Sequence, residues 1–207
     1  MPTLAIFHWA LEERKSGEKF PLRLTLADYN PSVLYLVTLP NIILTWALQQ
    51  RGELPILQEA FSPDDEELDL TPEVIQAFKD ALSANHIELS FLSGAWSPEF
   101  VELLNHPGES SSLADNTRTL VMGSETIYSP FALESFTATL LPILERERRE
   151  RPSGHAVAIV AAKKLYFGVG GSLDDFVDKM RELGSVVETL REETEGVRRG
   201  VVRCQLS

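Results

Sequence analysis

The sequence predicts an α/β fold, in which helices cover a largely parallel sheet. Segments of strand type alternate along the chain with segments of helix type, as in βαβ units. Two strand segments, 119–123 and 156–162, are almost entirely apolar, which is typical of strands buried in a parallel sheet. The last two strands, 186–190 and 197–205, follow each other without a helix, which predicts an antiparallel edge.

The other elements follow from local patterns. Pro40 lacks the N–H of a helical turn and is expected to kink a long helix over 32–51. Thr71 and Pro72 are typical of a helix start. The remaining predictions are helices over 4–15, 72–84, 98–104, from 130 into the charged run 145–151, and 172–183, strands over 22–27 and 87–92, and loops over 62–73 and 107–116.

The composition indicates a globular protein with a protein partner. The chain has 207 residues, 43% of them hydrophobic and 24% charged, which suits one domain over 1–207 with its own core. Its 31 acidic and 19 basic residues give a formal net charge of −12. Such a surface repels phosphate backbones and attracts basic proteins, so we expect a basic protein partner and no direct contact with nucleic acid.

Cysteine and hydropathy patterns indicate the compartment. Cys204 is the only cysteine, which excludes a disulfide within the chain and a cysteine-based zinc site. The four histidines are scattered without metal-ligand spacing, so no metal is predicted. The start of the chain lacks the pattern of a secretory signal, and no run of eighteen apolar residues occurs. We therefore expect a monomer in the cytoplasm or nucleus, with no membrane association.

Chemistry in such folds lies just beyond the carboxyl ends of the strands. Asp28 follows the strand over 22–27, where a carboxylate can accept two ribose hydroxyls of a nucleoside cofactor. The alternative is that Asp28 or Asn30 caps the next helix. Trp96 ends the turn after the strand over 87–92, where an indole can stack on adenine or belong to the core.

Glu125 and Tyr128 follow the buried strand over 119–123 at a spacing of three residues. They would share one face of a helical turn, where a carboxylate and a phenol can orient a nitrogen nucleophile and take its proton. Glu125 would otherwise cap the following helix. The segment 168–171 lacks phosphate-loop spacing and is interpreted as a flexible lip over a substrate, flanked by Tyr166 and Phe167.

Four segments resemble the protein-histidine methyltransferases, a family with a Rossmann-like seven-strand sheet that uses S-adenosylmethionine. These segments are Ala-Asp-Tyr-Asn-Pro-Ser-Val-Leu at 27–34, Phe-Leu-Ser-Gly-Ala-Trp at 91–96, Ser-Glu-Thr-Ile-Tyr at 124–128, and the run 161–171 ending in Phe-Gly-Val-Gly-Gly. The resemblance implies that Asp28 binds ribose, that Trp96 lies against adenine, and that Glu125 and Tyr128 line the methyl-acceptor site. It also implies cofactor contacts at Tyr29, Asn30, Gly94, Ala95 and Ser124.

The resemblance further implies methyl transfer to a histidine ring nitrogen of a large-subunit ribosomal protein. Two departures leave alternatives open. Ala95 stands where the family has Asp, and the chain begins Met-Pro-Thr-Leu after the point where the family's first strand and Gly-rich loop end. We therefore expect an N-terminally truncated methyltransferase domain. The alternatives are a non-catalytic methyltransferase-like binding protein and a lysine-directed methyltransferase.

Overall fold

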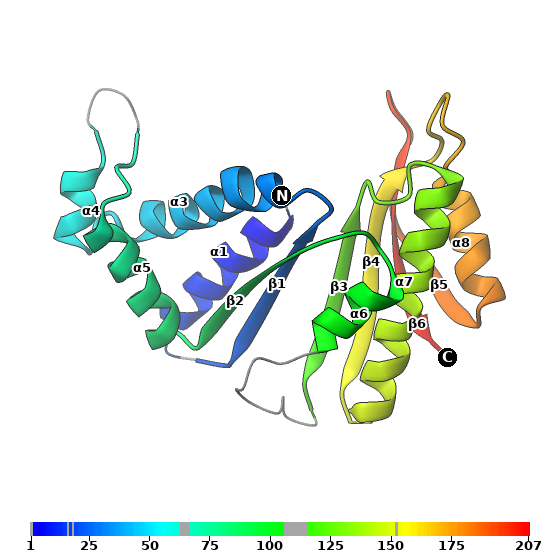
Figure 1. The fold of residues 1–207 in the computed structure, drawn as a ribbon, viewed down its shortest axis with the longest axis horizontal. Helices are drawn as coiled ribbons and strands as arrows, with labels where there is room; N and C mark the ends of the chain where they lie inside the picture. Colours follow the sequence, from blue (N-terminus) through cyan, green and yellow to red (C-terminus); the bar gives the residue numbers. More distant parts are fainter. Residues whose placement is uncertain (1, 16, 18, 63–66, 106–115, 152) are drawn as a thin grey trace. The chain divides into compact units, whose positions relative to one another are not determined.

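The computed structural model describes residues 2–15, 17, 19–62, 67–105, 116–151 and 153–207, and it divides into two compact units. Unit 1 is Met1–Gly94 and unit 2 is Ala95–Ser207. Each unit combines helices with a sheet, so the predicted α/β class is confirmed, and it is consistent with a methyltransferase fold (Figure 1). One domain over 1–207 stays a prediction. Most of the predicted loop 107–116, and residues 63–66 of the acidic segment, lie outside the described residues.

Unit 1 is built on two parallel strands, β1 (Leu22–Asp28) and β2 (Ile87–Ser93). Their register runs from Leu22 opposite Ile87 to Asp28 opposite Ser93, so both strands end at the same edge. In the described part of unit 1, β1 pairs with β2 alone. The helices of this unit are α1 (Pro2–Lys15), α2 (Pro31–Val33), the π-helical turn η1 (Leu34–Thr38), α3 (Leu39–Gln50), α4 (Pro55–Ala60) and α5 (Pro72–Ala84).

The core of unit 1 forms where α1, α3 and α5 pack beside the strands (Figure 1). Trp46 of α3 is almost completely buried, and its ring lies 5.3 Å from that of Phe78 of α5. Buried Arg14 ties the end of α1 to its neighbours, because its guanidinium donates to the carbonyl oxygens of Asn85 at 2.7 Å and Phe20 at 2.5 Å. Burying this charge is tolerated because its N–H groups find acceptors.

The helix predicted over 32–51 is interrupted just before Pro40. The chain forms a wide π turn over Leu34–Thr38 and resumes as α3, with Pro40 in its first turn, where no backbone N–H is needed. The described stretch Pro31–Gln50 has a mean hydropathy of 1.5, which by length and composition alone is enough to cross a membrane. A core helix passes the same test, and Ile42, Ile43 and Trp46 belong to the core of unit 1.

Unit 2 contains a four-stranded sheet in the order β3-β4-β6-β5. Strands β3 (Arg118–Ser124) and β4 (His155–Lys163) are parallel, whereas β6 (Arg199–Leu206) runs antiparallel to β4 and to β5 (Ser185–Glu193). The predicted antiparallel edge is therefore confirmed. Strand β6 lies between β4 and β5, so β5 is the strand at this edge. The helices of this unit are α6 (Pro98–Asn105), α7 (Pro130–Glu150) and α8 (Leu173–Glu182).

Alternate residues of β4 build the core of unit 2. Ala158, Val160 and Ala162 are buried on one face, which α7 and α8 cover (Figure 1). Large side chains of these helices, such as Phe136 and Phe176, belong to the same core cluster. This alternation fixes the face that each side chain presents, because a shift of one residue would reverse the pattern. The alternate side chains of β4 on the opposite face of the sheet are only half-buried.

Candidate functional site

The carboxyl ends of β1 and β2 bring together two of the residues predicted to bind a cofactor. Asp28 lies opposite Ser93, and the Gly94 N–H donates to the Asp28 carbonyl oxygen at 3.3 Å. Parallel pairing places both residues at one edge of the sheet, as their positions after the strands predict. This edge is the part of unit 1 where a ligand of the Asp28 carboxylate would lie.

The Asp28 carboxylate belongs to a tight turn. Its Oδ1 accepts the Asn30 N–H at 2.8 Å, and the Asn30 Oδ1 accepts the Ser32 N–H at 2.9 Å. Asn30 is therefore the N-cap of α2, so the alternative that Asp28 or Asn30 caps this helix is confirmed for Asn30 and not for Asp28. No other described residue forms a hydrogen bond with the Asp28 carboxylate, so none of them occupies Oδ2. Tyr29 between them is 72% exposed.

Trp96 lies in unit 2 and packs against its core. Its indole meets Phe100 edge-on at a centroid distance of 5.0 Å and Phe136 at 5.9 Å. Only part of the ring is accessible, and Ala95 before it is exposed and has no polar side-chain atom. The structure therefore gives Trp96 the core role that was its alternative interpretation, while its contact with adenine stays a prediction.

The carboxyl end of β3 places Glu125 in an unusual conformation. Ser124 pairs with Ala161 at the end of the parallel ladder, and the Glu125 N–H donates to the Ala161 carbonyl oxygen at 3.0 Å. Glu125 has a φ of +58°, a left-handed conformation that is uncommon for residues other than glycine. The chain turns here instead of starting a helix.

The predicted helical turn linking Glu125 and Tyr128 is therefore wrong. Residues 125–129 form no helix, and α7 starts only at Pro130, capped by the Ser129 hydroxyl, which accepts the Ala132 N–H at 3.1 Å. The alternative that Glu125 caps this helix is wrong as well. The two side chains follow the same strand end, and Tyr128 is 53% exposed.

Two residues from other segments contact the Glu125 carboxylate. The Tyr166 hydroxyl donates to Oε2 at 2.8 Å, and the Arg199 Nε lies 3.6 Å from Oε1. Burial, followed by the hydrogen bond to Glu125, raises the pKa of Tyr166 to about 12, so the phenol keeps its proton at neutral pH. Neither residue was among the predicted site residues.

The signal that could have identified Tyr166 is its position beside the glycines at 168–171. The Tyr166 N–H donates to the Gly171 carbonyl oxygen at 2.9 Å, which closes the loop. Gly171 lies so close to the backbone of Ile127 and Tyr128 that a Cβ would collide with them. The glycines thus bring Tyr166 against the turn that carries Glu125. Arg199 has no comparable sequence signal, because only the pairing of β6 with β4 brings it near Glu125.

Exposed aromatic and apolar side chains follow the same strand ends. Phe131 is 81% exposed and Phe167 is 89% exposed, and Leu165 and Val169 are also exposed. They belong to the segments after β3 and β4 that Gly171 joins. Among the residues that the structure describes, no group of three or more His, Cys, Asp or Glu side chains is placed to hold a metal.

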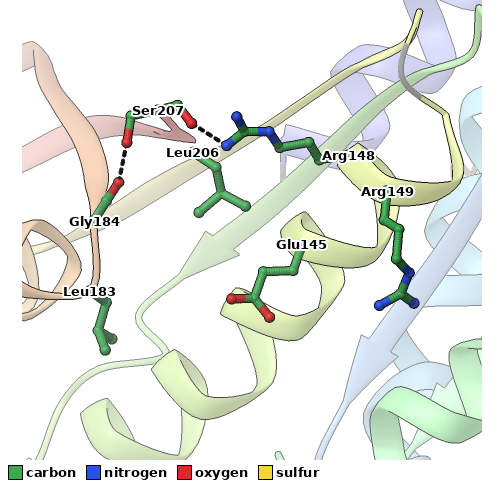
Figure 2. A pocket seen from close by; sticks show the side chains of 7 residues that line it. All are labelled: Glu145, Arg148, Arg149, Leu183, Gly184, Leu206 and Ser207. Atoms are coloured by element: carbon green, nitrogen blue, oxygen red, sulfur yellow. Dashed lines mark hydrogen bonds between the residues drawn. The ribbon is translucent and has the colours of Figure 1, made fainter.

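The cavity shown in Figure 2 lies elsewhere in unit 2. It has a volume of about 490 Å³ and is lined by Glu145, Arg148, Arg149, Leu183, Gly184, Leu206 and Ser207. Arg148 donates to the Ser207 carbonyl oxygen, and the Ser207 hydroxyl donates to that of Gly184 at 2.6 Å. Because β6 is antiparallel to β4, its end lies at the amino end of β4, away from Glu125. None of the predicted site residues lines this cavity.

Three curated relatives match most of the chain. The Saccharomyces cerevisiae protein named "Histidine protein methyltransferase 1" is 35% identical over 184 residues, which cover 85% of this chain and 45% of that protein. The Schizosaccharomyces pombe protein of the same name is 33% identical over 89% of this chain and 49% of its own length. A Bos taurus protein, "Histidine protein methyltransferase 1 homolog", is 30% identical over 86% of this chain and 39% of its own length.

No family model matches the chain. The chain spans about half the length, or less, of the curated relatives that it matches. The resemblance seen in the four sequence segments is nevertheless confirmed, since identities of 30% to 35% extend over most of the chain. By sequence, this chain is therefore a homologue of the curated histidine protein methyltransferases of yeasts and mammals.

Proposed function

We propose that the chain is an S-adenosylmethionine-dependent protein methyltransferase that acts on a histidine side chain. The observation that carries the proposal is the Glu125 carboxylate, which is held at the carboxyl end of β3 by Tyr166 and Arg199. Its side chain is 43% exposed, so an oxygen is accessible to a substrate. The names of the homologues support the same reaction.

A neutral imidazole suits this carboxylate. One ring nitrogen carries a proton and the other a lone pair. A hydrogen bond from the N–H to Glu125 therefore selects the tautomer, and the lone pair of the other nitrogen then points away from Glu125. The lone pair would bond to the methyl carbon as the methyl–sulfur bond of the sulfonium breaks and S-adenosylhomocysteine leaves. The ring would then be a cation, which the carboxylate stabilises. Glu125 then takes or passes on the N–H proton, leaving a neutral methylated ring. Tyr128 would line the same acceptor site.

The Asp28 edge of unit 1 suits the nucleoside of the cofactor. S-adenosylmethionine supplies an electrophilic methyl group on a sulfonium. The Asp28 Oδ2 is the oxygen that its turn does not use, and a carboxylate there fits vicinal ribose hydroxyls. Tyr29, Asn30, Gly94, Ala95, Trp96 and Ser124 are the further proposed contacts, of which Ala95 offers backbone atoms and a methyl group only.

The proposed substrate is a basic protein, and a ribosomal protein of the large subunit is its most specific form. A net charge of −12 favours encounter with a basic surface. We further propose that the chain acts as a monomer in the cytoplasm or nucleus, where ribosomal proteins are made and assembled.

Transfer of labelled methyl from S-adenosylmethionine to a basic, histidine-containing peptide tests this proposal. We expect methylhistidine by mass spectrometry, no label in the same peptide with Gln in place of His, and about a hundredfold loss of rate in Glu125→Gln. Glu188→Gln is the matched control, because Glu188 forms a comparable ion pair with Arg203 at 3.4 Å. Label in a histidine-free, lysine-containing peptide would instead support the lysine-directed alternative.

A non-catalytic binding protein is the second candidate, which Ala95 favours because its side chain has no polar atom for a cofactor contact. S-adenosylhomocysteine at a hundred times its dissociation constant should stabilise a folded receptor by about 2.7 kcal/mol. Stabilisation without transfer to any histidine peptide would support this candidate over the enzyme.

A further inference from the structure

Tyr166 holds the Glu125 carboxylate in a defined direction. The phenol oxygen accepts the Lys163 N–H at 3.3 Å, so its own proton is left for Glu125, whose Oε2 lies 2.8 Å away. The donor direction is thus set by the end of β4 and does not depend on solvent. The hydrogen bond runs from a neutral phenol to a carboxylate. Such charge-assisted hydrogen bonds are stronger than hydrogen bonds between two neutral groups.

Tyr166 is itself well fixed. Only 7% of the residue is exposed, and its ring belongs to the core cluster of unit 2. Two backbone hydrogen bonds join it to the loop: the Tyr166 N–H donates to the Gly171 carbonyl oxygen at 2.9 Å, and the Gly170 N–H donates to the Tyr166 carbonyl oxygen at 3.1 Å. A phenol on such a support loses little entropy when it orders a carboxylate.

The second contact of Glu125 is of a different kind. Arg199 is 58% exposed and its Nε lies 3.6 Å from Oε1, which is an ion-pair distance beyond that of a good hydrogen bond. Oε1 therefore keeps a lone pair for another donor, while Oε2 is occupied by Tyr166. The two oxygens of one carboxylate are thereby made unequal.

We propose that Tyr166 is a positioning residue of the methyl-acceptor site, which fixes Oε2 of Glu125 so that Oε1 accepts the N–H of the acceptor imidazole. This inference rests on the proposed function, because it takes Glu125 as the group that touches the substrate. It assigns to the tyrosine before the Gly-rich segment a role in catalysis that is separate from the lip over a substrate predicted from the sequence.

Kinetics of Tyr166→Phe test the inference. The variant keeps the ring and loses the hydroxyl, so we expect kcat for methylation of a histidine peptide to fall by about ten- to a hundredfold. The KM for S-adenosylmethionine should not change, because Asp28 is untouched. Tyr35→Phe is the matched control, since Tyr35 is 72% exposed and lies outside the proposed site.

A double-mutant cycle separates positioning from a merely structural role. In a Glu125→Ala background, Tyr166→Phe should cause no further loss of kcat, because the group that it positions is gone. Equal losses in both backgrounds would overturn the inference, and so would full activity of Tyr166→Phe beside an inactive Glu125→Gln. An inactive wild-type chain would overturn the proposed function, and this inference with it.

A spectroscopic measurement tests the contact independently of activity. The chain has four tyrosines, so ¹³C labelling at the phenol carbon gives four NMR signals, and Tyr166→Phe identifies one of them. We expect Glu125→Gln to shift this signal at neutral pH and Glu188→Gln to leave it in place. An unchanged signal in Glu125→Gln would show that the contact is absent, and would overturn the inference whatever the kinetics.

Discussion

Glu125 and His86 are the two residues other than glycine with a positive φ in the described part of the chain. His86 has a local reason, because it follows the end of α5, where chains commonly turn left-handed. Glu125 follows a strand and has no such reason. Backbone strain of this kind costs on the order of 1 kcal/mol or more and concentrates at functional sites. The left-handed conformation of Glu125 places its carboxylate in contact with Tyr166 and Arg199.

The thiol of Cys204 should be almost unreactive in the folded chain. It is fully buried, and burial raises its pKa to about 11 from an ordinary value of 9.0. At pH 8 the thiolate fraction is therefore about a hundredfold lower than in an exposed cysteine. We expect a thiol reagent to label the native chain at least about a hundredfold more slowly than the chain in urea. Rapid labelling at pH 8 without denaturant would contradict this.

The same pKa gives a direction to stability against pH. Between pH 9 and pH 11 the folded state keeps the Cys204 proton that the unfolded state loses, so the free energy of unfolding falls as pH rises through this range. Below pH 9 the contribution is fully present. Denaturation in urea at pH 8 and pH 10 should show a smaller decrease in Cys204→Ala than in the wild-type chain.

At the scale of elements, the end of α5 can be improved. His86 has a φ of +53°, its N–H donates to the Ser83 carbonyl oxygen at 3.1 Å, and its side chain is exposed. Glycine adopts this conformation without the Cβ penalty, so His86→Gly should raise the free energy of unfolding by about 0.5–1 kcal/mol. His86→Ala keeps the penalty and is the control. A gain of equal size in the alanine variant would show that the backbone is not the cause.

The packing of α7 on β3 leaves no room at Gly123. A Cβ there would lie 2.7 Å from Cζ of Phe136, so Gly123→Ala should lower the free energy of unfolding by about 1–3 kcal/mol. Gly52→Ala is the matched control, because nothing lies within 4 Å of its Cβ position. That variant should be stabilised by about 0.4–1 kcal/mol. Thermal or urea denaturation of the pair measures both effects, and equal stability of the two would contradict the packing.

Most elements could be predicted because their signals are local. The strands β1, β3, β4 and β6 were recognised from apolar patterning, and α5 from Thr71 and Pro72, whose cap the structure contains. The short helix α4 and the π turn before Pro40 were missed, because each depends on packing in unit 1 and on no distinct residue pattern. The left-handed Glu125 was missed for a similar reason, since glutamate does not ordinarily mark such a turn.

At the scale of the whole molecule, the sequence could identify strand ends but not side-chain partners. Asp28, Gly94, Ser124 and Glu125 lie at strand ends as predicted. Tyr166 and Arg199 come to Glu125 only because β3, β4 and β6 are neighbours in one sheet. Residues 41 and 74 positions apart along the chain leave no joint pattern in a single sequence.

Net charge should govern how the chain meets its proposed substrate. With a formal charge of −12, long-range attraction raises the rate of encounter with a basic protein, and salt screens that attraction over about 10 Å at 0.1 M. We therefore expect the KM for a basic histidine peptide to rise by about threefold or more between about 0.05 M and 0.5 M salt, with kcat nearly constant. Constancy of kcat follows because the bound imidazole reacts as a neutral nucleophile beside a fixed carboxylate.

A peptide with the same histidine and Gln in place of its basic residues should show a high KM that salt does not change. If both peptides responded equally to salt, the net charge would have no part in substrate selection, and recognition would have to come from contacts close to the acceptor.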